Sequence, residues 1–261
     1  MKRKLCVLVA MAWPLASQAD LTLTGFSMVG AFGMPSSSQE KIWIQNGLVR
    51  RDFVDRGRSY SYLFDLDKHQ AVAVDHLLHM AENHDLTALK AKTEISAPAS
   101  GLKLDFEATG RTRPLNSWKC QEHNLSATMP ARLGNEETVF HLNGQVWIAS
   151  GVPEQAAIKS FNKLADKQDF FLTIPGIANT SPAQARALSE VIRKLAAKGL
   201  PCGGELTASF EGNGPMANLA KKMPAKFAIT FQDFSTEAIK PETFVVPAGY
   251  RVYQRPAGGM P

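Results

Sequence analysis

The sequence predicts an α+β domain in which helices cover one face of a curved antiparallel sheet. Three observations favour this class: segments in which apolar and polar residues alternate, Asn-Gly pairs between such segments, and two later segments with helical spacing of apolar residues. Alternation gives each strand one face for the core and one for water, which is typical of antiparallel sheets. With 261 residues, 44% of them hydrophobic, the chain has enough apolar material for such a core.

The first nineteen residues have the features of a secretory signal peptide. Three basic residues at positions 2–4 precede the apolar run Leu5–Ala16, and Ala19 ends a Ser-Gln-Ala sequence that suits a signal peptidase. A retained membrane anchor is the alternative, but the run of about a dozen residues is shorter than the ~20 residues that a spanning helix needs. We therefore expect cleavage after Ala19, export to the periplasm and one mature domain over residues 20–261, with no transmembrane segment.

The charge of the chain does not favour a nucleic-acid partner. The formal net charge of +5 falls to +2 once the three basic residues of the signal are removed. Basic pairs remain at Arg50-Arg51 and Lys221-Lys222, but Asp52 follows the first, and a nucleic-acid surface needs basic residues clustered on one face. We expect no binding of nucleic acid.

Two cysteines remain after the signal, Cys120 and Cys202. An even number of cysteines in an oxidising compartment predicts a disulfide between them. Two unpaired buried thiols are the alternative, because pairing geometry is not visible in a sequence.

Alternation and turn residues predict the strands. From Lys41 to Asp75 we expect a four-strand meander whose first hairpin turns at Asn46-Gly47, a pair that tolerates positive φ. A second hairpin is expected at Asn143-Gly144, and loops at Met34–Ser38 and Met129–Asn135. Further strands are expected where alternation continues, at 102–107, 205–211 and 226–232.

Helical spacing predicts two helices, Pro153–Lys167 and Ser181–Lys198, and a shorter one at Leu86–Lys92. In the second, Ser181 can cap the first turn and Gly199 can end the helix. We expect these helices to lie on the apolar face of the sheet.

The sequence lacks the motifs of the common enzyme classes. It contains no Gly-x-Ser-x-Gly elbow, no Gly-x-Gly-x-x-Gly and no phosphate-binding loop, so we expect a protein that is not an enzyme and has no cofactor. His76, His79 and His84 form a local cluster with Asp75, and a metal site there is a third hypothesis. The alternative to a metal site is a strand-to-loop segment with exposed imidazoles. Because no third ligand has a fixed spacing, we favour this alternative and predict that no metal is bound.

Aromatic residues on the expected strands give two interpretations. They either fill an ordinary core or line a cavity for a lipid-like ligand. The predicted cavity residues are Trp43, Tyr60, Tyr62, Phe64, Phe106, Phe227, Ile229 and Phe231.

Several stretches, in order along residues 21–253, resemble uncharacterised periplasmic families of the LolA-like superfamily. The best anchors are Asp65-Leu66-Asp67-Lys68, the stretch Ala108-Thr109-Gly110-Arg111 that leads to Cys120, and Pro247-Ala248-Gly249-Tyr250. The resemblance implies a half-open β-barrel with helices as a lid over an apolar cavity. Carriers of this superfamily transport acylated lipoproteins, and relatives bind other hydrophobic ligands or sense envelope stress.

Together these observations predict a non-enzymatic periplasmic protein that binds a lipid or acyl chain, free or on an acylated protein, in the concave face of a curved sheet. The alternative is an envelope module for protein–protein interaction or stress sensing, with a filled core and no small ligand.

Overall fold

The computed structural model describes residues 20–31, 34–55, 57–86, 101–133, 135–152, 159, 162 and 182–254. The predicted signal at 1–19 lies outside the described residues. So do the predicted helix Leu86–Lys92, apart from Leu86, and the predicted helix Pro153–Lys167, apart from Lys159 and Asn162, which are both helical.

The described residues form twelve strands, two α-helices and one 3-10 helix. Their bounds are β1 (Leu21–Ala31), β2 (Met34–Gln45), β3 (Leu48–Asp55), β4 (Arg58–Asp65), β5 (Gln70–Asp75), β6 (Met80–Asp85), β7 (Lys103–Leu115), β8 (Trp118–Leu133), β9 (Glu136–Ala149), α3 (Pro182–Lys198), β10 (Leu200–Glu211), α4 (Pro215–Lys222), β11 (Ala225–Ser235), η2 (Pro241–Phe244) and β12 (Arg251–Gln254).

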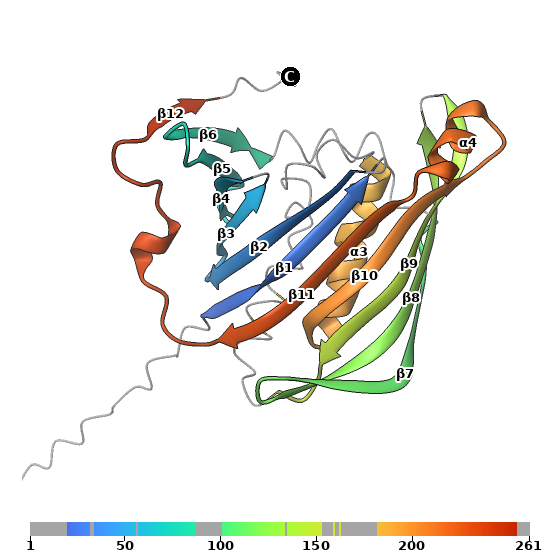
Figure 1. Cartoon of the computed structure of the whole chain (residues 1–261), viewed down its shortest axis with the longest axis horizontal. Coiled ribbons are helices and arrows are strands. Elements are labelled where there is room, and N and C mark those ends of the chain that lie inside the picture. The colour runs from blue at the N-terminus through green and yellow to red at the C-terminus, as the bar shows by residue number, and fades with distance from the viewer. Residues whose placement is uncertain are drawn as a thin grey trace, which may run out of the picture.

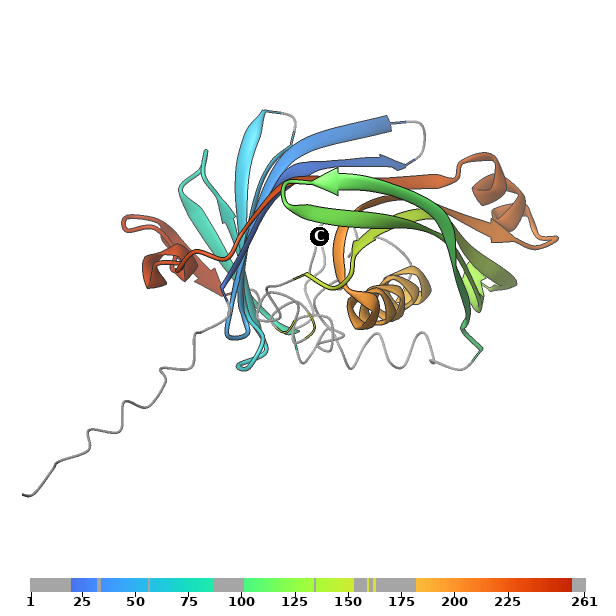
Figure 2. The ribbon, with the colours of Figure 1, turned by 90° about the horizontal axis from the view of Figure 1, so that it is seen from below.

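All twelve strands belong to one sheet in the order β12-β6-β5-β4-β3-β2-β1-β11-β10-β9-β8-β7. Neighbours are antiparallel except β12 and β6, which run parallel. The sheet curves strongly but does not close, so β12 and β7 are its edges (Figures 1 and 2). The prediction of an α+β domain, a half-open barrel covered by helices, is therefore wrong: the described chain is nearly all β, and it contains only two α-helices.

The predicted meander is confirmed as β2 to β5. Asn46 and Gly47 have φ of 47° and 82°, so both turn positions use the left-handed region that this pair tolerates. The turns after β4 and β5 each begin with an aspartate and end with a histidine at positive φ, His69 at 53° and His79 at 50°.

The prediction of a hairpin at Asn143-Gly144 is wrong, because β9 runs straight through both residues. Gly144 lies where β10 approaches so closely that a Cβ atom would meet the carbonyl oxygen of Glu205. A glycine in a strand serves such close approach as well as a turn. The expected loops at Met34–Ser38 and Met129–Asn135 are also wrong up to Leu133, because β2 begins at Met34 and β8 ends at Leu133.

The core lies on the concave side of the sheet, where α3 packs against β8, β9 and β10 (Figure 2). The α3 bounds agree with the predicted helix Ser181–Lys198 to one residue at its start. Val191 and Leu195 bury their side chains among those of the three strands, whereas Ala196 joins a second cluster that extends to Leu21 and Ile44 near the centre of the sheet.

The predicted disulfide is confirmed: Cys120 of β8 and Cys202 of β10 are joined across β9, with 6.3 Å between their Cα atoms. Both cysteines are fully buried. The bond thus ties together two strands that are not direct neighbours in the sheet.

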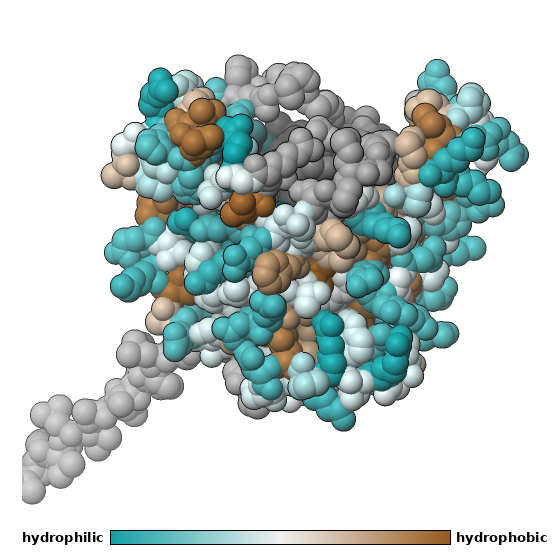
Figure 3. Space-filling model, in the orientation of Figure 1, coloured by the Kyte–Doolittle hydropathy of each residue, from teal (hydrophilic) through white to brown (hydrophobic). Residues whose placement is uncertain are grey.

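The C-terminal segment that contains η2 lies on the convex side of β3 to β6, before the chain enters the sheet as its edge strand β12 (Figures 1 and 2). Val246 and Tyr250 pack against Leu63, Val74 and Ala81 there. Figure 3 shows apolar surface at its two upper corners. Large apolar side chains are exposed in the turn before β6, at Leu77 and Leu78, and on α4, at Met216 and Leu219. No helix among the described residues is long and apolar enough to cross a membrane.

Candidate functional site

Seven of the eight predicted cavity residues lie on the concave face. Residues directly opposite in neighbouring strands point to the same side of a sheet. The register runs from Phe227 of β11 through Leu206, Gly144 and Leu125 to Phe106 of β7. Ile229 and Phe231 alternate with Phe227 along β11 and therefore share this face.

The same register reaches the other half of the sheet. Phe231 is opposite Gly25, and the row continues through Glu40 and Phe53 to Tyr60 of β4. Tyr62 and Phe64 follow Tyr60 at every second position of β4. These residues therefore face the same hollow side as Phe106, but from the opposite half of the sheet.

Trp43 lies on the other face. It is opposite Thr22 and Arg50, one position out of step with the concave residues. On the convex side its ring lies under two cations, with the Lys41 ammonium 4.9 Å and the Arg50 guanidinium 5.5 Å from its centroid. Trp43 is thus separated from the other predicted cavity residues by the sheet itself.

Three of the seven concave residues fill the core. Tyr62, Phe64 and Phe231 are buried in the cluster with Leu21 and Leu23, and Ile229 packs against it partly buried. Phe53 stacks between Tyr60 and Tyr62, with ring centroids 5.5 and 5.1 Å away. In this half of the sheet the aromatic residues have packing partners of their own.

Charged side chains interrupt this apolar surface. Glu40, only 2% exposed, accepts hydrogen bonds from Arg51 and from the hydroxyl of Ser27, and the Arg51 guanidinium lies 5.0 Å from the centroid of Phe53. Arg58 makes an ion pair with Asp75 at 2.6 Å. Both arginines are therefore neutralised by carboxylates of the same face.

Phe106 and Phe227 belong to the other half, with the cluster that α3 covers. Both are only partly buried. The ring of Phe106 stacks on His123, with 4.4 Å between centroids and 10° between planes. Its other side is open to a pocket between β7 and α3.

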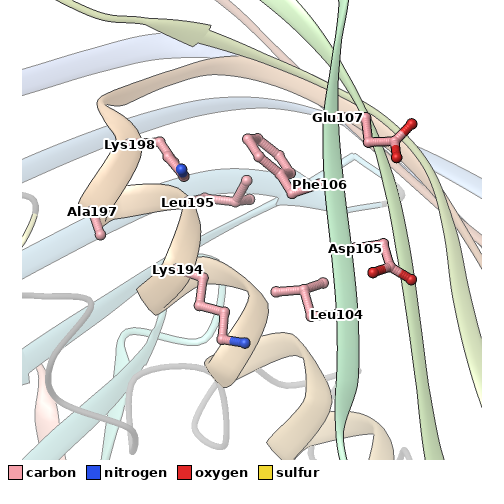
Figure 4. Close-up of a pocket in the computed structure, with 8 residues that line it drawn as sticks. All are labelled: Leu104, Asp105, Phe106, Glu107, Lys194, Leu195, Ala197 and Lys198. Carbon is pink, nitrogen blue, oxygen red and sulfur yellow. The ribbon is translucent and has the colours of Figure 1, made fainter.

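This pocket has a volume of about 470 Å³ and is the candidate functional site (Figure 4). It exists because the apolar face of the sheet extends one strand further than the helix that covers it. On β8, Leu125, Ala127 and Met129 are buried, whereas on the edge strand β7 Leu104 and Phe106 are only partly buried. A volume of this size lies within the range of about 300–1,000 Å³ that is usual for small-molecule sites.

The pocket has an apolar floor and a charged rim. Leu104 and Phe106 point from β7 toward α3, where Leu195 faces them (Figure 4). Lys194 and Lys198 come from the same helix. Asp105 and Glu107 alternate with the apolar residues of β7, so their carboxylates point away from the helix, across the strand.

Sequence reasoning identified Phe106 but missed the other side of this site. Leu104 and Leu195 were visible as members of an alternating and a helical apolar pattern, without any sign that they face each other. Lys194 and Lys198 are four residues apart and share a helix face, which the sequence does show. Their position opposite β7 depends on long-range packing.

The histidine cluster does not assemble a metal site. The ring of His76 lies between the hydroxyls of Ser61 and Tyr250, at 2.6 and 2.9 Å, whereas Asp75 accepts hydrogen bonds from the backbone of Leu77 and Leu78. Within the described part of the chain, no group of three His, Cys, Asp or Glu side chains could hold a metal ion. The Ser61 hydroxyl also donates to Asp52, and at 1% exposure it is closed to a substrate.

A second polar group lies on the convex face beside the disulfide. Glu122 is buried and accepts hydrogen bonds from Thr109 and Arg111. The Arg113 guanidinium lies 4.6 Å from the centroid of Trp147 and donates to the carbonyl of Cys202. Burial lowers the pKa of Arg113, although the carboxylate of Glu122 acts to raise it. These contacts hold the β7–β8 hairpin against the sheet.

No family model and no curated protein matches this sequence.

Proposed function

We propose that this chain is a non-enzymatic binding protein whose concave face takes up a hydrophobic ligand such as an acyl chain, in the pocket between β7 and α3. One observation carries the proposal: the apolar floor of that pocket continues the core from the buried Leu195 to Leu104 and Phe106, which the described residues leave partly exposed. Exposing such side chains costs free energy, at about 25 cal/mol per Å² of apolar surface. An acyl chain would remove that surface from water.

The proposal includes export to the periplasm. The disulfide supports this part, because disulfides persist in oxidising compartments. The resemblance to LolA-like families remains a prediction, and the proposal does not depend on it.

The test is a titration of delipidated mature protein with a fluorescent fatty-acid probe. We expect saturable binding that Phe106→Ser weakens about tenfold or more, because the substitution removes the largest apolar wall of the pocket. Phe26→Ser is the matched control. Phe26 is exposed on the convex face of β1, so this variant should bind the probe as tightly as the wild type does. Circular dichroism establishes that both variants are folded. Absence of saturable binding to the wild type would overturn the proposal.

A second candidate is a protein–protein interaction module. The observation that favours it is the exposed pair Leu77 and Leu78, at 67% and 51%, next to the edge strand β12. An open edge with apolar residues beside it can take up a strand from another protein. Crosslinking in a periplasmic extract tests it: a partner captured by the wild type should be lost in Leu77→Ser/Leu78→Ser, while Phe106→Ser retains it.

A further inference from the structure

We infer that the ligand of the pocket between β7 and α3 is a fatty acid in its anionic form, with its carboxylate between Lys194 and Lys198. This inference rests on the proposed function, since it requires that the pocket holds an acyl chain. It adds the head group and the two residues that recognise it.

The two lysines place a concentrated positive charge at one side of an apolar pocket. They are four residues apart on α3, so one helical turn separates them and both lie beside Leu195 (Figure 4). Two like charges at this spacing repel each other. A carboxylate between them would relieve that repulsion, and its acyl chain would cover Leu104 and Phe106.

Neither lysine is neutralised by a carboxylate of the described residues. Within the described part of the chain, no carboxylate pairs with the ammonium of Lys194 or Lys198, whereas Arg193 on the same helix pairs with Glu190 at 2.6 Å. The carboxylates nearest in the pocket, Asp105 and Glu107, point away from α3 on the other side of β7 (Figure 4). The charges of the lysines are thus free for a ligand.

The end of the helix itself does not attract an anion. Both lysines lie near the C-terminus of α3, where the helix dipole amounts to roughly −0.5 elementary charge. Two ammonium groups outweigh this partial charge. The anion site therefore depends on the lysine side chains, and their removal should abolish it. Lysine presents a compact point charge, which suits a carboxylate at the end of a flexible chain.

The experiment measures how dodecanoate, dodecanol and dodecyltrimethylammonium displace the neutral apolar probe N-phenyl-1-naphthylamine from the delipidated protein. The three carry unbranched alkyl chains of eleven or twelve carbons, and their head groups are anionic, neutral and cationic. We expect dodecanoate to bind at least about tenfold more tightly than dodecanol, and the cation to bind most weakly. Added salt should reduce the difference, because the lysines are exposed to solvent.

Lys194→Gln/Lys198→Gln should bring dodecanoate to the affinity of dodecanol and leave dodecanol unchanged. The matched control is Lys221→Gln/Lys222→Gln, which removes two exposed lysines from the last turn of α4 and should change neither affinity. If dodecanol binds as tightly as dodecanoate, the inferred head group is wrong and the hydrophobic pocket stands. If no alkyl compound displaces the probe, the proposed function itself is wrong.

Discussion

The Arg51 guanidinium and the Glu40 carboxylate form a buried ion pair between β3 and β2, with 3.0 Å between Nε of Arg51 and Oε2 of Glu40. Arg51 lies opposite Ile42 and Tyr62 in the register, so the pair occupies the concave face among apolar side chains. Burial of one charge without its partner is costly, because water no longer solvates it.

We expect Arg51→Met to destabilise the fold by about 3–5 kcal/mol, since it leaves Glu40 buried and unpaired. Glu40→Leu/Arg51→Met should be less destabilised than the single variant, because it removes both charges. The control is Arg193→Met on the exposed face of α3, with an expected change of at most about 0.5 kcal/mol. Urea denaturation measures all three. A single variant Arg51→Met within 1 kcal/mol of the wild type would contradict this interpretation.

The Cys120–Cys202 disulfide closes a loop of 82 residues. The chain-entropy relation for a loop of this length gives a stabilisation of about 4–5 kcal/mol. We therefore expect Cys120→Ser/Cys202→Ser to lose stability of this order in chemical denaturation. Reductant should lower the midpoint of the wild type toward that of the variant and leave the variant unaffected. An unchanged wild-type midpoint in reductant that demonstrably cleaves the bond would contradict the prediction.

Local patterns predicted the meander but not the extent of the sheet. The Asn46-Gly47 turn and the alternation on each side of it are decided by neighbours in the sequence, and both are confirmed. The strands β8 and β9 span 16 and 14 residues, through positions that resemble turns locally. Position 144 needs a glycine because the backbone of Glu205, 61 residues later in the sequence, lies too close for a Cβ atom. The residues next to Gly144 do not indicate this contact.

The candidate site shows the same division. The alternation of Leu104 and Phe106 predicted an apolar strand face, and the spacing of Val191 and Leu195 predicted an apolar helix stripe. The pocket arises only from how far α3 lies from the edge strand β7. That distance is set by how the helix packs on the sheet. The sequence therefore indicated which residues line the pocket, but it did not show that a space remains between them.

We expect Gly144→Ala to destabilise the fold by about 1–3 kcal/mol, because the added methyl group would meet the backbone of Glu205 and force the strands apart. Gly30→Ala is the matched control on β1: its Cβ would lie 3.9 Å from the nearest atom, in Lys226, and its φ is not in the left-handed region. Thermal denaturation compares the two. Equal thermal unfolding midpoints for both variants would show that the close approach of β9 and β10 does not require a glycine at position 144.

Trp43→Phe should leave the affinity for a fatty-acid probe unchanged, because the sheet separates Trp43 from the concave face. In the variant Lys41 and Arg50 stack on a smaller phenyl ring, which binds cations more weakly than indole, so a loss of stability of at most about 0.5–1 kcal/mol is expected. Probe titration and thermal denaturation are measured on the same sample. A large loss of affinity in a variant that is fully folded would place ligand contacts on the convex side.

Asp65 precedes the turn between β4 and β5. Its carboxylate accepts hydrogen bonds from both the backbone N–H and the ammonium of Lys68. Partial burial acts to raise the pKa of Asp65, but hydrogen bonds from the Lys68 ammonium and backbone, together with the charge of the ammonium, outweigh burial and lower that pKa below its ordinary value of 3.8. A carboxyl group with a lowered pKa stabilises the fold above its unfolded pKa, and this contribution is lost as the pH falls through the folded pKa.

Lys68→Gln should therefore raise the pKa of Asp65 toward 3.8, because the ammonium charge is lost while the backbone hydrogen bond remains. NMR titration of the Asp65 carboxyl resonance measures the shift, and stability should respond to the substitution at neutral pH but not below the folded pKa. Lys226→Gln, an exposed lysine on β11, is the control and should leave the Asp65 titration unchanged. An Asp65 titration that is identical in Lys68→Gln and the wild type would show that the ammonium does not hold the carboxylate, and that the backbone of the turn alone lowers its pKa.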